Sequence, residues 1–511
     1  MKGGSRVLLD MDMYIGSQQL MKKFDECLLK HGYTIEELVD KASDCLLKHI
    51  DGKSLSIVCG PGNNGADGLS LAIKLYQQGQ HVKVFIFEDH EHLSQANAYY
   101  LQKCYDLSIE VYHFQAENLD QTLEHMKTSD TIVDAMFGFG LNSSPRGLYQ
   151  GVIEGINQFY DKEVIAVDIP TGLDCNSGKP YQSVVSATKT ITLSALKNGF
   201  LNPDSQYFTG EVIVEKLDLE DVSEEAGLYQ LADEEYVSFI LKDRIFDGYK
   251  GTYGHTCLIT GSPEYKGAAL LSAKSCVYSG SGITTVMSVP EVIQSLTHFC
   301  PEATAVIRAP ILLKEDLAKY DALLIGCGLG QSLESYRYVI DVLEKTSQPL
   351  VIDADALTIL SAHIDLLKTQ KHDIILTPHL GEFRRLCDFK DDDDMLVVAR
   401  DFALKYHVVL VLKGPYTIVT NGYESYRIFS GNKAMATGGM GDVLAGMITS
   451  FVGQGYSALQ AAMLGVFIHG YAGDHLAETA YTVIPSKLID YIPTAMHEII
   501  KSNQQRLLKR N

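Results

Sequence analysis

The sequence predicts two α/β domains, each a mostly parallel sheet with helices on both faces. The chain has 511 residues, too many for one ordinary domain at roughly 150 residues per domain. Short apolar runs alternate with helical periodicity in both halves, which is typical of parallel sheets covered on both faces. The acidic stretch at 219–236 interrupts this alternation and has no strand character. We therefore expect a domain at 1–218, a linker at 219–236 and a second domain at 237–511.

The first half contains a series of predicted strands separated by helices. Residues 1 to about 50 show helical apolar spacing, for example at Leu20 and Phe24. A glycine-rich turn follows the first strand, and a helix is expected to begin near Leu69. A polar helix is expected at 92–105. The strands are expected at 55–59, 81–87, 131–134, 164–168, 189–193 and 211–214.

The second half has the same architecture without a repeat of the sequence. A small-residue helix is expected at 267–282. Residues 416–419 and 425–429 are expected to form a hairpin around Asn421 and Gly422, a two-residue turn signal. A glycine turn then leads into a long apolar helix. The other strands are expected at 256–260, 283–287, 322–326, 349–353, 373–377 and 408–412.

The composition excludes several classes of protein. With 43 Lys and Arg against 64 Asp and Glu, the net charge is −21, which argues against a surface that grips nucleic acid or anionic lipid. No apolar run reaches the roughly 18 residues of a membrane span, and we expect no signal peptide. The 10 cysteines are scattered without a CxxC pair, which predicts buried, reduced thiols. We expect a cytoplasmic protein that binds neither nucleic acid nor membranes.

Three strands of the first half lead into polar loops that contain glycine. The first loop, GPGNNGADG at 60–68, lies between a strand and a helix, a geometry that can hold an anion on backbone amides. The other two follow Asp134 and Asp168. Ligands of open α/β sheets bind outside the carboxyl ends of the strands, so the three loops point to one crevice. The two acids and the asparagines suit cation binding and acid/base chemistry, although each acid could instead cap a turn.

These loops resemble a known family. GPGNNGADGLSLA, DAMFGFGL and AVDIPTGLD resemble, in order and spacing, the Rossmann-like epimerase domain of NAD(P)H-hydrate repair enzymes. That domain interconverts the R and S forms of NAD(P)H hydrated at C6 of the nicotinamide ring. Here Ala66 replaces the second glycine of the family's usual NNGGDG loop. The resemblance implies that Asp168 transfers protons at the epimerised centre.

The same resemblance implies a set of ligand contacts. A potassium ion would be held by Asn64, Asp134 and Thr171. The hydrated nucleotide would be contacted by Asp168 and by Asn63, Asn64, Gly65, Ala66, Asp67, Gly138, Phe139, Gly140, Leu141, Asn142, Ser143 and Ser144.

The strongest signal in the chain is ATGGMGDVLAG at 436–446. Its glycines can expose consecutive amides, and the apolar helix that follows places its positive N-terminus at the same point. This arrangement stabilises negative charge on a transferring phosphoryl group. Asp442, in the first turn of that helix, is suited to take a proton from a hydroxyl nucleophile; a plain helix cap is the alternative.

GGMGD followed by a small-residue helix resembles ribokinase-like kinases. YGHTCLITGSPEYKGAALLSA, LVIDADAL, ILTPHLGEF, VLKGPYTIV and GNKAMATGGMGD resemble, in order, the ADP-dependent NAD(P)H-hydrate dehydratase domain. The resemblance implies that the C6 hydroxyl of the S hydrate is phosphorylated by ADP with Mg²⁺. Phosphate then leaves and the ring double bond returns, with AMP as the second product. The two resemblances together imply a homo-oligomeric bifunctional enzyme acting on NADHX and NADPHX.

The second resemblance also implies residue roles. Asp442 would be the base, Gly441 would lie in the anion hole, and Cys327 stands where the family has proline. His379 would face the substrate, although a polar cap is an equal alternative. The acidic run 391–394 is interpreted as a solvated loop. The substrate pocket would include Ala268, Gly330, His379 and Asp442, and the adenine nucleotide would bind at Lys413, Gly414, Pro415, Tyr416, Thr417 and Gly441.

Two other functions stay open. A ribokinase-like vitamin or sugar kinase with a regulatory first domain would accumulate a phosphorylated product, whereas a dehydratase would release phosphate. A noncatalytic binding scaffold is the third hypothesis. The net charge of −21 and the presence of Asp134 and Asp168 argue against a scaffold.

Overall fold

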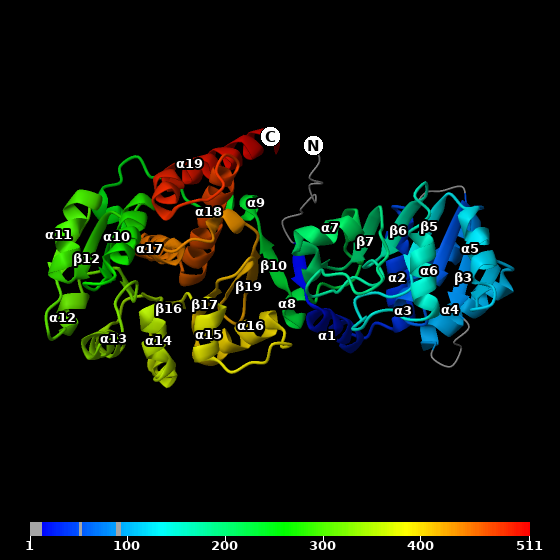
Figure 1. Cartoon of the computed structure of the whole chain (residues 1–511), viewed down its shortest axis with the longest axis horizontal. Helices are drawn as coiled ribbons and strands as arrows, with labels where there is room; N and C mark the ends of the chain where they lie inside the picture. Colours follow the sequence, from blue (N-terminus) through cyan, green and yellow to red (C-terminus); the bar gives the residue numbers. More distant parts are fainter. Residues whose placement is uncertain (1–12, 51–53, 88–92, 511) are drawn as a thin grey trace. The chain divides into compact units, whose positions relative to one another are not determined.

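The computed structural model describes residues 13–50, 54–87 and 93–510 and divides into two compact units, Met1–Leu228 and Tyr229–Asn511 (Figure 1). The boundary falls inside the acidic stretch. That stretch contains α8 (Ser223–Ala226), β10 (Tyr229–Ala232) and α9 (Glu234–Ile240), so the expectation that it lacks a strand is wrong. Tyr229, Leu231 and Ala232 are buried, and this short apolar core of β10 outweighs the acidic flanks.

The first unit is built on a parallel sheet. Among the described residues the sheet has 7 strands in the order β4-β3-β2-β5-β6-β7-β9, so the chain reverses direction across the sheet between β2 and β5. The edge strand β4 is not predicted from the sequence; most of its residues are only partly buried. The strands are β2 (Ser54–Cys59), β3 (His81–Phe87), β4 (Glu110–Phe114), β5 (Thr131–Ala135), β6 (Glu163–Val167), β7 (Lys189–Leu193) and β9 (Glu211–Glu215).

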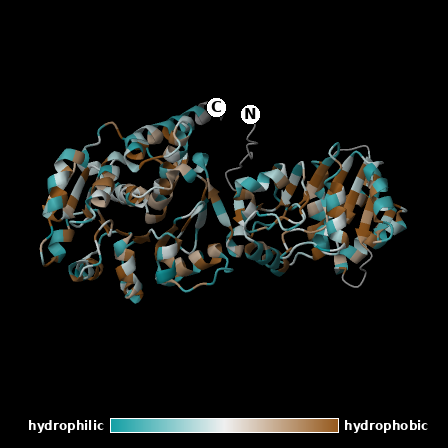
Figure 2. Cartoon of the chain, in the orientation of Figure 1, coloured by the Kyte–Doolittle hydropathy of each residue, from teal (hydrophilic) through white to brown (hydrophobic). Residues whose placement is uncertain are grey.

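Helices cover both faces of this sheet, as predicted. One apolar cluster joins the sheet to α2, α3 and α4, and another joins the opposite face to α5 and α6. In Figure 2 the strands of this sheet are largely hydrophobic. The short strand β1 (Tyr14–Gly16) pairs with β8 (Leu196–Lys197). The helices are α1 (Gln18–Lys30), α2 (Ile35–Leu47), α3 (Asn63–Gln77), α4 (Gln95–Asp106), α5 (Leu119–Lys127), α6 (Leu148–Ile156) and α7 (Gln206–Thr209).

Helix α3 begins at Asn63, earlier than the start expected near Leu69. The glycine loop is therefore short, and most of its residues form the first turns of the helix. Gly68 explains the difference, since a Cβ there would lie 2.6 Å from the Cβ of Ala135 on the sheet. Glycine is needed here for close packing of helix on strand rather than to break the helix.

The second unit has a longer, mixed sheet. Its strands run in the order β13-β12-β11-β14-β15-β16-β17-β18-β19-β10, parallel except that β18 is antiparallel to both of its neighbours. The exposed edge strand β13 is not predicted. The strands are β11 (His255–Ile259), β12 (Ile283–Ser288), β13 (Thr304–Ile307), β14 (Ala322–Ile325), β15 (Leu350–Ile352), β16 (Ile374–Leu376), β17 (Val409–Leu412), β18 (Thr417–Thr420) and β19 (Ser425–Ile428).

The predicted hairpin is confirmed as β18 and β19, but its turn is longer than the two residues expected. Asn421 Oδ1 accepts hydrogen bonds from the amides of Tyr423 at 2.9 Å and Glu424 at 2.7 Å, and this side-chain turn closes the loop at 421–424.

The core of the second unit surrounds the apolar helix α17, which packs against α10 and α18. No helix of the described residues is long and apolar enough to cross a membrane. All 10 cysteines lie in the described part of the chain as free thiols, buried except for the half-buried Cys387, as predicted. The helices are α10 (Lys266–Tyr278), α11 (Pro290–Phe299), α12 (Lys314–Leu317), α13 (Leu333–Lys345), α14 (Asp355–Ser361), α15 (Leu380–Leu386), α16 (Met395–Tyr406), α17 (Met440–Gly453), α18 (Ala458–Ala477) and α19 (Pro485–Arg510).

Candidate active sites

The first unit has a cavity of about 500 Å³ that is lined by the loops following β2, β5 and β6. This is the point where the strand order reverses, and the sequence predicted a crevice there. Two apolar helix faces, from α1 and α2, close the opposite side of the cavity. Of the predicted contacts, the cavity brings together Asn63, Asn64, Asp67, Gly138, Phe139, Gly140, Leu141, Asn142 and Asp168.

Four predicted contacts do not line the cavity, namely Gly65, Ala66, Ser143 and Ser144. Gly65 and Ala66 are buried in α3, and Ala66 packs into the apolar core behind the site. The methyl group that distinguishes this loop from the family's usual NNGGDG therefore points away from the cavity. Among the described residues, Ser144 has a buried hydroxyl without a hydrogen-bond partner.

Close backbone packing holds the first loop in place. A Cβ at Gly60 would collide with the carbonyl oxygen of Met136, so only glycine lets these two loops meet. Asn97, buried on α4, donates from Nδ2 to the carbonyl oxygens of Gly60 at 2.7 Å and Gly62 at 3.2 Å. This side chain therefore holds the loop from behind, leaving its front open to the cavity.

Asp134 ties the second and third loops together. Its fully buried carboxylate accepts hydrogen bonds at 2.8 Å from both the backbone amide and the hydroxyl of Thr171, and one at 3.2 Å from the amide of Met136. Burial raises the pKa of Asp134 to about 6, against the lowering effect of these hydrogen bonds. Within the chain, Asp134 therefore makes the contacts of a turn-capping residue, which is the alternative that the sequence predicts for it.

The three residues expected to hold potassium lie in one chain of contacts. Phe137 donates its amide to the hydroxyl of Thr171 at 3.0 Å, and at the next residue a Cβ on Gly138 would lie 3.1 Å from Asn64 Oδ1. Among the described residues, the buried Asn64 Nδ2 has no hydrogen-bond partner, so this side-chain amide has an unused polar end. Carboxylate, hydroxyl and amide oxygens are the donors that a hard cation prefers, and the residues present fit one.

Asp168 is held by a lysine that the sequence analysis missed. Lys197, on β8, is fully buried, and its Nζ lies 2.6 Å from Asp168 Oδ1. The same oxygen accepts from the amide of Leu193 at 3.2 Å, and Oδ2 accepts from the amide of Phe139 at 3.4 Å. Asp168 also has a φ of +67°, a strained conformation that is often found at functional sites. The sequence signal for this role is a lysine at the end of an apolar run, because a buried lysine needs a partner.

Two more carboxyl groups line the same cavity. Burial and, to a smaller extent, the negative charge of Asp168 raise the pKa of Asp25, on α1, to about 7 against the lowering effect of Lys197. Burial and the charges of Asp168 and Asp25 raise the pKa of Asp67 well above its usual value. Asp25 was also missed, although it stands on the apolar helix face between Met21 and Leu28, where a solvated acid is out of place.

In the second unit, Asp442 lies in the first turn of α17, as predicted. The helix follows Gly439, whose φ of +95° favours glycine and turns the loop into the helix. Burial raises the pKa of Asp442 to about 6, helped by the charge of Asp353, while Cys327 and Lys413 act in the opposite direction. A buried carboxylate with a pKa near neutrality has the properties of a general base.

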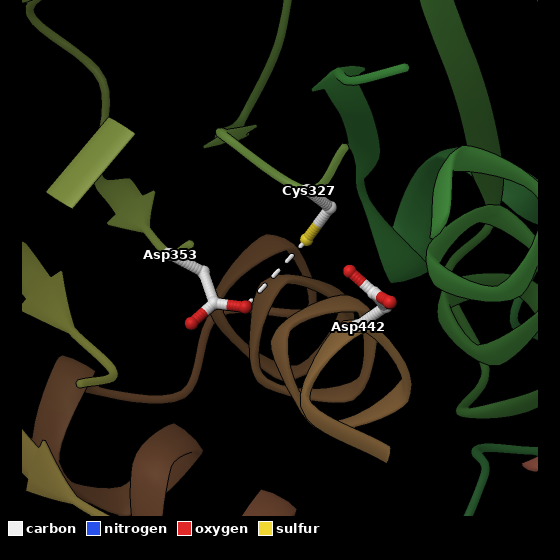
Figure 3. A group of neighbouring side chains, drawn as sticks. All are labelled: Cys327, Asp353 and Asp442. Carbon is white, nitrogen blue, oxygen red and sulfur yellow. Dashed lines mark hydrogen bonds between the residues drawn. The ribbon is translucent and has the colours of Figure 1, made fainter. Parts of the chain in front are cut away.

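Figure 3 shows Asp442 facing two further side chains, Asp353 at the end of β15 and Cys327 after β14. One ligand atom from each of the three lies within 4.8 Å of the other two, and the Cys327 thiol donates to Asp353 Oδ2 at 3.7 Å. Thr377 Oγ1 donates to Asp353 Oδ1 at 2.8 Å. Asp353 lies in the segment LVIDADAL, but the sequence predicts no role for this residue.

Lys413 is not a free surface cation. Its Nζ lies 2.9 Å from Asp353 Oδ1 and 3.9 Å from Glu382 Oε2. Burial lowers the pKa of Lys413, but the charges of Asp353 and Glu382 outweigh burial and the net pKa is raised. A Cβ on Gly441 would lie 3.3 Å from Lys413 Nζ, so this ammonium sits beside the glycine loop. Backbone amides, the helix end and Lys413 therefore concentrate positive potential next to Asp442.

His379 makes the contacts of a helix cap. Its Nδ1 accepts from the amides of Gly381 at 3.0 Å and Glu382 at 3.2 Å, and Glu382 returns the capping box by accepting from the His379 amide at 2.8 Å. His379 is therefore a polar helix cap, one of the two alternatives that the sequence predicts for it. Its Nε2 lies 3.6 Å from Glu382 Oε1, and the side chain is 59% exposed. Lys413 donates its amide to the Pro378 carbonyl at 2.8 Å, which places the two loops side by side.

The remaining predicted residues lie at the same end of the sheet. A Cβ on Gly328 would lie 2.8 Å from the Cβ of Ala268, and Gly330 donates its amide to Asp355 Oδ2 at 2.8 Å. Gly414 and Pro415 are exposed, and the ring of Tyr416 stacks on Phe429 with centroids 5.4 Å apart, while Thr417 begins β18. Residues 391–393 are exposed, in agreement with a solvated loop.

Comparisons with known proteins agree with this geometry. A family model described as YjeF-related protein N-terminus matches residues 18–199, and one described as NAD(P)H-hydrate dehydratase matches 256–494. A relative from Coxiella burnetii, named a bifunctional NAD(P)H-hydrate repair enzyme, is 34% identical over 84% of this chain and 86% of its own length. One of the same name from Escherichia coli is 32% identical over 84% of this chain and 81% of its own.

Two further comparisons concern the second unit. A Staphylococcus aureus protein named ADP-dependent (S)-NAD(P)H-hydrate dehydratase is 38% identical over 50% of this chain and 92% of its own. A solved structure of a ribokinase-like superfamily protein from Enterococcus faecalis superposes with a TM-score of 0.50 at 31% identity, over 53% of this chain and 95% of that one.

Proposed function

The chain belongs to the family of bifunctional NAD(P)H-hydrate repair enzymes, and on that premise we propose a division of labour between its two units. The first unit interconverts the R and S hydrates of NADH and NADPH. The second unit dehydrates the S hydrate with ADP and releases AMP and phosphate. The proposal assigns epimerisation to residues 1–218 and dehydration to 237–511, joined at 219–236.

One observation supports the dehydratase half more than any other. Asp442, whose pKa burial raises to about 6, stands in the first turn of α17 beside the glycine loop and Lys413. The base and the anion-stabilising groups therefore lie together. Asp442 takes the proton of the C6 hydroxyl, whose oxygen attacks the terminal phosphorus of ADP, and AMP leaves.

Phosphorylation makes the second step possible. The C6–O bond then breaks with its electron pair on phosphate, and loss of a proton from C5 restores the ring double bond. Hydroxide would be a poor leaving group, whereas phosphate is a good one. Lys413 and the amides at Gly441 stabilise the charge that moves through this sequence.

Binding roles follow from position at the carboxyl ends of the strands. Lys413, Gly414, Pro415, Tyr416 and Thr417 receive the adenine nucleotide. The exposed side chain of His379 contacts the hydrated nicotinamide nucleotide, together with Ala268 and Gly330. In the first unit the nine predicted residues that line the cavity contact the hydrate. Asp168 transfers protons at the epimerised centre.

Two cations complete the proposal. Potassium would be held by Asn64, Asp134 and Thr171 and would supply a fixed positive charge near the loops around the cavity. Magnesium enters with ADP, since Mg²⁺ prefers phosphate and carboxylate oxygens, and Asp353 and Glu382 are the carboxylates closest to Lys413. The thiol of Cys327 is too soft a donor for Mg²⁺ and takes no part in holding it.

One assay tests the whole proposal. The protein is incubated with mixed R and S NADH hydrates, K⁺, Mg²⁺ and ADP, and the absorbance of reduced nicotinamide is followed together with free phosphate. We expect full conversion with one phosphate per NADH. Conversion that stops when the S form is exhausted would overturn the epimerase role, and an accumulating phosphorylated product would indicate the kinase alternative.

Two broader expectations stay predictions. The homo-oligomer can be tested by light scattering at several concentrations. The cytoplasmic location can be tested by cell fractionation, and the buried free thiols support a reducing compartment.

A further inference from the structure

The first unit contains a second acid that the proposed function does not use. Asp25, on α1, lines the same cavity as Asp168, and the two carboxyl groups are close enough for the charge of Asp168 to act on Asp25. Neither the Asp25 nor the Asp67 side chain forms a hydrogen bond to any described residue, whereas the Asp168 carboxylate is held by Lys197 and by two backbone amides. Asp25 is therefore a free carboxyl group facing the place where the substrate would lie.

The charge balance of the cavity sets the protonation of these groups. The carboxyl groups of Asp25, Asp67 and Asp168 face one another, with the ammonium of Lys197 as the cation among them. Lys197 is committed to Asp168, with Nζ 2.6 Å from its Oδ1. Like charges in an apolar cavity cannot all be present, so protons are retained on the groups that lack the lysine.

The walls around Asp25 reinforce this. Met21, Leu28 and Leu29 of α1 and Ile35, Leu38, Val39 and Ala42 of α2 line the cavity next to it. An apolar wall disfavours the carboxylate form of Asp25 and suits the ring carbons of the hydrated nicotinamide. A protonated acid and a lysine-bound carboxylate in one cavity form the kind of pair that performs acid and base catalysis at neutral pH.

We propose that Asp25 is the second proton-transfer residue of the epimerase, working together with Asp168, with Lys197 as the positioning residue that holds Asp168 by an ion pair. The proposal rests on the epimerase function proposed above. C6 of the hydrate carries a hydroxyl group and is bonded to N1, so inversion requires one bond at C6 to break and form again.

Asp25 gives its proton to the C6 hydroxyl. The C6–O bond breaks with its electron pair on the departing water, and the N1 lone pair forms a C6=N1 double bond. A water adds to the other face of C6, the electron pair returns to N1, and Asp168 takes the proton released from that water. One proton has moved from Asp25 to Asp168, and the reverse reaction moves it back.

The decisive experiment measures R/S exchange by NMR in the full chain, without ADP, so that dehydration does not interfere. We expect Asp25→Asn to slow exchange by about 100-fold or more and Asp25→Glu to recover part of the rate. Glu26→Gln is the matched control, because Glu26 is the exposed neighbour on the same helix and should leave exchange unchanged. Dehydration of the S hydrate with ADP should proceed in every variant.

The pH dependence separates a catalytic role from a structural one. The active form shares one proton between Asp25 and Asp168, so wild-type exchange should fall above pH 7 as Asp25 loses that proton. Lys197 lowers the pKa of Asp25, so Lys197→Met should move this fall to higher pH, while Lys197→Arg should keep it near the wild-type position. Exchange in ¹⁸O-labelled water should place the label on C6.

Specific results would overturn the inference. Asp25→Asn with exchange within threefold of wild type would remove Asp25 from the mechanism, and exchange without ¹⁸O incorporation would exclude breakage of the C6–O bond. An unshifted pH profile in Lys197→Met would remove the positioning role. A wild-type protein that does not exchange R and S at all would instead refute the proposed epimerase function itself.

Discussion

At the scale of single residues, burial decides which acids do chemistry. Asp134, Asp168 and Asp442 were all selected from strand ends and helix starts, and the structure gives each a different environment. Asp134 is hydrogen-bonded to Thr171 and Met136, Asp168 is paired with Lys197, and Asp442 has no ion pair of its own among the described residues. An aspartate side chain thus links two loops at Asp134, forms an ion pair at Asp168 and is a base without an ion pair at Asp442.

Asp442→Asn is expected to abolish recovery of NADH while R/S exchange continues, because the amide cannot accept the hydroxyl proton. In the wild type, kcat/KM for dehydration should fall about tenfold per pH unit below pH 6. The sign follows from the pKa of about 6, since the base must be ionised and is protonated below that value. A pH profile of NADH formation from pure S hydrate measures this, and a profile flat down to pH 5 would contradict it.

Cys327, which stands in place of the family's proline, is expected to tune Asp442. The thiol beside Asp442 lowers the pKa of that carboxyl, so Cys327→Ala should raise the pKa and move the acid limb of dehydration to higher pH. The shift should appear in the pH profile with little change in rate at pH 8. Cys387→Ala, at the half-buried cysteine elsewhere in the unit, serves as the control. A rate loss that is equal at every pH would mean that Cys327 only packs the loop.

At the scale of elements, glycine sets how closely helices and strands approach. Gly446 lies in the middle of α17, where a Cβ would collide with the backbone oxygen of Ser272 on α10. The helix that aims its N-terminus at the site is therefore fixed by backbone-to-backbone packing against α10. Gly439 does the complementary work by turning the chain into this helix.

Gly446→Ala should destabilise the protein by about 1–3 kcal/mol through overpacking. Gly267→Ala is the matched control, because Gly267 lies in α10 with no atom within 4 Å of its added Cβ. There the substitution should be neutral or stabilising by up to about 1 kcal/mol, from helix propensity. Urea unfolding followed by circular dichroism compares the two, and equal effects would contradict the packing argument.

At the scale of the whole molecule, each unit contains a complete set of groups for its own reaction. The cavity of the first unit is lined by residues between Met21 and Leu217, and the groups around Asp442 all come from the second unit. The two proposed reactions share the hydrate as their common compound, and the groups assigned to each reaction lie within one unit.

Mixing Asp168→Asn with Asp442→Asn should therefore restore full conversion of a mixed R and S hydrate preparation. The first variant supplies dehydratase, the second supplies epimerase, and the S hydrate passes between them through solvent. Each variant alone should stop short, as measured by the final absorbance of reduced nicotinamide. Recovery limited to the initial S fraction in the mixture would show that the two activities must reside in one chain.

The sequence by itself determined the fold class, most of the parallel strands and the three loops and one helix start that carry the chemistry. These features rest on local patterns, namely apolar runs for β2 and β5, glycine beside Asn63 and Asn64, and an acid at Asp442. The exposed edge strands β4 and β13 escaped prediction because pairing with a neighbour, rather than their own residues, makes them strands.

Only the tertiary structure decided which distant side chains join those loops. Asp25, Lys197 and Asp353 lie outside the glycine loops, and their positions follow from how α1, β8 and β15 pack around the two sites. It also turned Ala66 away from the cavity and made His379 a cap. The physical reason is that burial and opposite charge act through space, so a local sequence pattern identifies the loop but not the partner that sets its chemistry.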